Sequence, residues 1–107
     1  MNLLNFFLIF FLIFNFYFFL DLVLPPRIKI YYPKNKQVVY HDTLTFKGKV
    51  DKRGIFFINN LPVYFNDNGH FEKVFYLKEG LNRFIITGRK FWGQETKMNY
   101  EIIYLKR

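Results

Sequence analysis

The chain opens with one long apolar stretch and then changes to short alternating segments. Residues 3–20 read LLNFFLIFFLIFNFYFFL, in which the two asparagines are the polar positions. Extended to Leu24, a helix over this stretch is about 33 Å long, which matches a bilayer core of about 30 Å. Because lipid offers no partner to free backbone groups, a helix is the expected state. Residues 3–24 are therefore predicted to cross a lipid bilayer.

The flanks of this span favour an uncleaved anchor but give conflicting signals on its orientation. The first small residue is Gly48, far beyond a signal-peptide cleavage site, and no basic residue precedes the apolar run. Four basic residues that follow the span favour a cytoplasmic domain: Arg27, Lys29, Lys34 and Lys36. A domain longer than about 60 residues translocates against such a bias, and the family resemblance described below favours an extracytoplasmic domain.

The rest of the chain, residues 25–107, alternates in the manner of strands separated by turns. Pro25-Pro26 ends the helix, and Asn59-Asn60 suits a hairpin because asparagine tolerates positive φ. The predicted strands cover residues 27–32, 42–50, 55–59, 61–65, 70–77, 82–90 and 96–105. Seven strands with a turn about every ten residues are typical of a two-sheet sandwich. The length fits one domain.

Several strand and turn motifs resemble the bacterial immunoglobulin-like domains of the glucodextranase domain-B type. The motifs are a proline after the first strand, a hydrophobic-x-hydrophobic-x-Gly second strand, an asparagine hairpin and turn glycines. In this chain they stand at Pro33, Leu44–Gly48, Asn59, Gly69–Phe71, Leu77–Asn82 and Gly93. Asn60 and Lys90 depart from the pattern, which has a hairpin glycine and a turn-capping aspartate there. The resemblance implies an all-β, seven-stranded immunoglobulin-like Greek-key sandwich on an exported protein, and such motifs specify fold better than function.

Composition removes several kinds of chemistry. The chain has no Cys and no Ser, which excludes disulfides, thiolate nucleophiles, cysteine-based zinc sites and the commonest hydroxyl nucleophile. His41 and His70 have no second ligand at metal-binding spacing, and the turn at residues 66–69 lacks the spaced acids of a calcium loop. We therefore expect no catalytic residue, metal, cofactor or small-molecule substrate, and do not predict an enzyme.

The net charge of +8 suits an anionic partner, because all 16 basic residues follow the span. These charges are scattered along the strands, as on a solvated face. A protein that binds single-stranded nucleic acid needs exposed aromatic side chains on which the bases stack. Phe46, Phe71 and Phe84 are instead predicted to point inward. Nucleic acid is therefore not a favoured partner.

A partner surface is predicted on the outer side of one sheet. Along the hairpin, the predicted inward residues are Phe56, Ile58, Val63 and Phe65. Phe57 and Tyr64 are then expected to face each other outside, in a sheet shared with the sixth and seventh strands. The predicted partner-binding residues are Phe57, Tyr64, Ile85 and Ile103, with Arg83, Arg89 and Lys97 at the edges. An apolar patch rimmed by charge usually marks an interface; an aromatic-rich composition that leaves aromatics exposed is the alternative.

These features lead to a functional hypothesis with alternatives. Residues 1–24 form an anchor, and residues 25–107 form a binding or spacer module that engages a protein or glycan outside the cytoplasm, at the cell envelope. The first alternative is an accessory subunit of a membrane complex, held by its Phe-rich helix, with Asn5 and Asn15 bonded to other helices. A membrane-active peptide with a basic tail is disfavoured by the regular strand pattern, and a nucleic-acid-binding β-domain is also less favoured.

Overall fold

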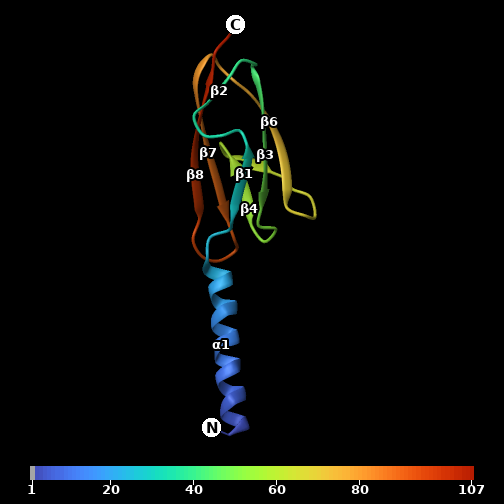
Figure 1. Ribbon diagram of the computed structural model, residues 1–107, viewed down its shortest axis with the longest axis vertical. Helices are drawn as coiled ribbons and strands as arrows, with labels where there is room; N and C mark the ends of the chain where they lie inside the picture. Colours follow the sequence, from blue (N-terminus) through green and yellow to red (C-terminus); the bar gives the residue numbers. More distant parts are fainter. Residues whose placement is uncertain (1) are drawn as a thin grey trace.

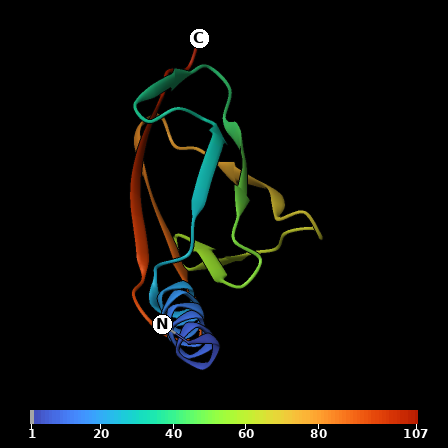
Figure 2. The ribbon, with the colours of Figure 1, turned by 60° about the horizontal axis from the view of Figure 1, so that its bottom comes forward.

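The residues that the structure describes form one helix and eight strands. The computed structural model describes residues 2–107, except for the side chains of residues 21–23. The elements are α1 (Leu3–Val23), β1 (Ile28–Tyr32), β2 (Gln37–Val39), β3 (Thr43–Val50), β4 (Ile55–Ile58), β5 (Leu61–Val63), β6 (His70–Tyr76), β7 (Gly80–Arg89) and β8 (Thr96–Tyr104). Figures 1 and 2 show two sheets as separate layers, with α1 projecting from one end and the C-terminus at the other. The molecule is elongated, 74 × 23 × 20 Å.

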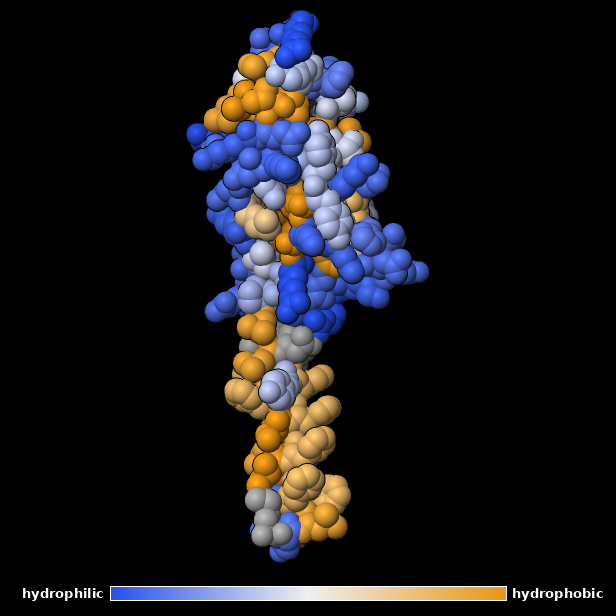
Figure 3. All heavy atoms as spheres, viewed as in Figure 1, coloured by the Kyte–Doolittle hydropathy of each residue, from blue (hydrophilic) through white to orange (hydrophobic). Residues whose placement is uncertain are grey.

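α1 is apolar on all sides and stands free of the sandwich. Asn2 caps it, since its Oδ1 accepts a hydrogen bond of 2.9 Å from the Asn5 amide. None of the residues in the stretch Leu3–Leu20 is buried, and by length and composition this helix can cross a membrane. Its 21 residues correspond to about 31 Å. In Figure 3 hydrophobic side chains cover α1, whereas the sandwich surface is mostly hydrophilic.

The strands form a three-stranded sheet, in the order β1-β3-β6, and a five-stranded sheet, in the order β2-β8-β7-β4-β5. Strand β2 was not predicted, so the sequence-based count of seven strands is wrong. β2 is three residues long, too short to show an alternation. Its pairing with the end of β8 is parallel, and the Leu105 amide extends this pairing by donating to the Val39 carbonyl at 3.0 Å.

The core is a single apolar layer between the sheets. Phe46 of β3 is 0% exposed, and its ring centroid lies 4.9 Å from that of Phe84, on β7 of the other sheet. Phe75 of β6 contacts both rings, at 5.6 Å and 5.1 Å. The other buried apolar residues are Val39, Leu44, Val50, Phe56, Ile58, Val63, Phe71, Leu77, Ile86 and Ile102. The alternation predicted for β3 is therefore confirmed.

Truncating Phe46 tests this core. Phe46→Ala should lower the free energy of unfolding by about 3–5 kcal/mol, because it leaves a cavity at the contact between the sheets. Denaturant unfolding of the full chain in detergent measures the change. Phe91→Ala removes the same atoms from a side chain that is 88% exposed and should cost less than about 0.5 kcal/mol. Equal losses in the two variants would contradict the assigned core.

Candidate interaction surface

The outer face of the five-stranded sheet carries the predicted partner residues other than Tyr64 in cross-strand rows. β7 lies at its centre, between β8 and β4. The rows, read across the strands, are Ile55–Arg89, Phe57–Thr87–Lys97, Ile85–Asn99, Arg83–Glu101 and Val38–Ile103–Leu81. Side chains in one row lie close enough to interact. The rows therefore determine which predicted residues meet.

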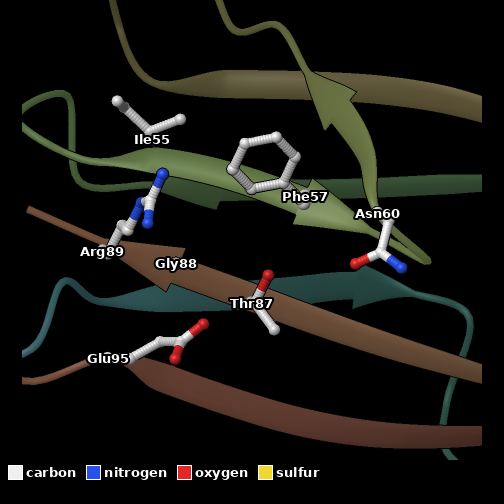
Figure 4. A pocket seen from close by; sticks show the side chains of 7 residues that line it. All are labelled: Ile55, Phe57, Asn60, Thr87, Gly88, Arg89 and Glu95. Carbon is white, nitrogen blue, oxygen red and sulfur yellow. The ribbon is translucent and has the colours of Figure 1, made fainter.

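Phe57 and Arg89 meet at an open pocket of about 240 Å³. Figure 4 shows that Ile55 and Phe57 reach it from β4, Thr87 and Arg89 from β7, and Glu95 from the segment before β8. An aromatic ring thus lies beside one cation and one carboxylate. Small-molecule sites usually occupy about 300–1,000 Å³, so this pocket suits a single side chain or sugar unit on a larger partner.

Tyr64 does not lie opposite Phe57, so the predicted pairing is wrong. Phe57 pairs with Pro62 instead. The reason is the two-residue turn, in which both asparagines have positive φ, 50° and 67°, and Ile58 and Leu61 form the first pair. Tyr64 then follows the end of β5 and is 82% exposed.

Ile85 and Ile103 are separated by an ion pair. Arg83 and Glu101 form the row between them, with Nε and Oε1 3.9 Å apart. The apolar surface is therefore divided into two halves. The pocket half holds Ile55, Phe57, Pro62 and Ile85, and the distal half holds Val38, Leu81, Ile103 and Leu105.

The pocket also contains residues that the sequence analysis did not select. Ile55 shares the outward alternation of Phe57, a signal that was available in the sequence. Thr87 was placed outward but not assigned to the partner-binding set. Glu95 belongs to an irregular loop, where no alternation indicates the direction of a side chain. Its position depends on the path of that loop.

Asn59 fixes the register of this face, because its backbone and side chain continue the hydrogen bonding to β7 beyond the end of β4. β4 ends at Ile58, but the Asn59 amide still donates to the Ile85 carbonyl at 2.9 Å. The Asn59 side chain accepts from the Ile85 amide at 2.8 Å through Oδ1 and donates to the Arg83 carbonyl at 3.3 Å through Nδ2. These bonds hold Arg83 and Ile85 of β7 against the turn.

Other polar groups do not gather into a second centre on the part of the chain that the structure describes. Within it, no three His, Cys, Asp or Glu side chains lie close enough together to hold a metal ion. His70 stacks near Tyr31, with ring centroids 6.2 Å apart. Burial raises the pKa of Tyr100, whose ring contacts Phe46 in the core.

No family model matches the chain, and no curated protein is significantly similar to it. Assignment of this surface therefore depends on its geometry and chemistry alone.

The two hairpin asparagines provide a matched test of the surface. Asn59→Ala should lower the free energy of unfolding by about 1–3 kcal/mol, because it removes two hydrogen bonds and places alanine at a positive φ that asparagine tolerates better. Asn60→Gly should leave stability unchanged or raise it slightly, because glycine adopts positive φ without strain. Thermal and denaturant unfolding of the full chain measure both changes. Equal losses in the two variants would contradict the bridging role of Asn59.

Proposed function

We propose that this chain is a membrane-anchored binding or spacer module without enzymatic activity. α1 crosses the membrane, and an immunoglobulin-like sandwich outside the cytoplasm engages a protein or glycan at the cell envelope. The observation that carries the proposal is the direct continuation of an uncovered apolar helix into a two-sheet domain. Such a domain holds its outer face in a fixed position relative to the helix.

The strand connections support the immunoglobulin-like assignment. The chain passes from β3 in one sheet to β4 in the other, then from β5 back to β6, and from β6 across again to β7. All strand pairs except β2 with β8 are antiparallel. Repeated crossing between two largely antiparallel sheets is typical of Greek-key sandwiches. The turn residues that carry the family resemblance lie where the turns form: Gly69, Gly80 and Gly93 have φ of 82°, 99° and 100°.

The pocket half of the outer face supports a macromolecular partner. It combines exposed aliphatic groups and Phe57 with Arg89, and aromatic and arginine side chains carry much of the energy at interfaces. The small volume of the pocket favours one projecting group of a larger partner over a buried ligand.

The first test concerns insertion and topology. The full chain should stay with membranes through alkaline carbonate washing, because its 18-residue apolar stretch has no polar face. Intact mass should show that α1 is retained. Protease added to intact spheroplasts should digest the sandwich. Release by carbonate would contradict the anchor, and protection until lysis would contradict the extracytoplasmic placement.

The second test concerns the outer face. Phe57→Ser combined with Ile85→Ser should weaken crosslinking to the native partner in membranes, while the melting temperature changes little. Val74→Ser with Tyr76→Ser, two exposed positions on β6 of the other sheet, is the matched control and should leave crosslinking intact. If the first variant folds and retains its partners, the outer face is not the site and the Phe-rich helix becomes the better candidate.

A further inference from the structure

The junction between α1 and the sandwich is short and firmly held. α1 ends at Val23, and Pro26 is already buried at the base of the sandwich. The Pro26 carbonyl accepts a hydrogen bond of 2.6 Å from Thr96 Oγ1, and the Arg27 carbonyl accepts one of 3.0 Å from the Asp51 amide. Three residue steps from Val23 to Pro26 span at most about 10 Å.

This length determines where the base of the sandwich lies once α1 crosses a bilayer, as proposed above. The headgroup layer on each side of the hydrocarbon core is about 5–8 Å thick. A domain joined to the core edge by about 10 Å of chain therefore lies against or within the headgroups. Its base cannot stay in bulk water.

The base carries a group of basic side chains that we call the basic collar: Arg27, Lys29, Lys49, Arg53 and Lys90. Together with the Leu24 end of the helix, these residues line an open groove of about 810 Å³ in which Asp51 is the one carboxylate. Asp51 is engaged by Arg53 at 3.1 Å and by Lys90 at 3.6 Å.

The other three collar residues have no carboxylate partner among the described side chains. Lys29 and Lys49 are cross-strand neighbours of β1 and β3. Like charges placed directly opposite each other destabilise a sheet. An anion bound between them would offset that repulsion.

Two exposed aromatic side chains lie at the same end. The loop between β7 and β8 begins at Lys90, which lines the groove, and leads to Thr96, which bonds to Pro26. Within it, Phe91 and Trp92 are 88% and 63% exposed, and their rings pack edge to face at 5.0 Å. Figures 1 and 2 show this loop beside the end of α1. Tryptophan is enriched at the level of the headgroups in membrane proteins.

We propose that the base of the sandwich is a binding surface for anionic phospholipid headgroups. Arg27, Lys29 and Lys49 of the basic collar bind their phosphates, while Phe91 and Trp92 enter the interfacial layer beside α1. An anionic membrane surface attracts basic side chains that lie within about a Debye length of it. The collar meets both conditions, because it is basic and the short junction holds it at the headgroup layer. Binding at both the collar and the aromatic loop fixes the tilt of the sandwich on the membrane.

Trp92 is the sole tryptophan of the chain, so its fluorescence reports on this surface alone. The full chain is reconstituted in vesicles of phosphatidylcholine, with and without phosphatidylglycerol. Anionic lipid should shift Trp92 emission to shorter wavelength and reduce quenching by acrylamide. It should also increase quenching by lipids that are spin-labelled near the headgroup. Salt of about 1 M should reverse much of the change, because the Debye length falls to about 3 Å.

Two charge variants separate local recognition from net charge. Changing Arg27, Lys29 and Lys49 to Gln should abolish the response of Trp92 to phosphatidylglycerol. Changing Lys34, Lys78 and Lys106 to Gln removes the same charge from the opposite end and should preserve the response. Equal losses in both variants, or an unchanged response in both, would overturn recognition by the collar.

The comparison of lipids with the unmodified chain needs no variant and also decides the proposal. Trp92 that stays open to acrylamide in both lipids, in a chain that resists carbonate extraction, would overturn the headgroup surface and leave the anchor intact. A chain extracted by carbonate would instead contradict the anchor itself. The two failures are therefore distinguishable.

Discussion

Pro26 is the point on which the relation between helix and sandwich depends. It lacks an amide hydrogen and cannot continue α1, yet it is buried among core residues of the domain. Gly54 makes room for it, because a Cβ at that position would lie 3.1 Å from Pro26 and 2.7 Å from the Phe56 ring. Thr96 then binds the Pro26 carbonyl. These contacts hold the chain to the sandwich from Pro26 onward, so that Leu24 and Pro25 are the two residues between them and the end of α1 at Val23.

The same basic residues that suit a lipid surface also bear on orientation. Arg27 and Lys29 directly follow the span, where positive charge favours retention in the cytoplasm. In the folded chain they join Lys49, which is 20 residues further on, so only part of the collar acts during insertion. The complete collar exists only after folding. The lipid binding that we propose for it depends on the anionic lipid content of the leaflet it meets, whereas the orientation of the span depends on the residues that flank it in the sequence.

Sequence alternation predicted the parts of the fold that are long and half-buried. β3 shows this best, because Leu44, Phe46 and Val50 are buried as expected. The pairing of Phe57 was missed by two residues. It depends on whether Ile58 pairs with Leu61 across a two-residue turn, as observed, or with Val63 across a longer loop, and alternation fits both.

β2 escaped prediction for a different reason: its pairing partner, the end of β8, lies more than 60 residues away. The composition of the pocket was also only partly predictable from local sequence. Phe57 and Arg89 were both selected from their strands, but Glu95 reaches the pocket from a loop. Trp92 belongs to that loop as well, and its place beside the helix follows from the bond between Thr96 and Pro26. Such contacts form only when segments distant in the sequence come together in the fold, so no local sequence pattern indicates them.

With α1 in a bilayer, as we propose, the two halves of the outer face lie at different heights above the membrane surface. The pocket half includes Arg89 and Glu95, next to the loop that we place in the headgroup layer. The distal half includes Leu81, which lies eight residues before Arg89 on β7. Eight residues correspond to about 26 Å of strand. On that placement, a partner that fills the pocket would approach the bilayer closely, as another membrane-anchored chain or a lipid-linked glycan does. A soluble partner would reach the distal half without meeting the headgroups. The row of Arg83 and Glu101, which divides the apolar surface, would then separate two zones that differ in the kind of partner they accept.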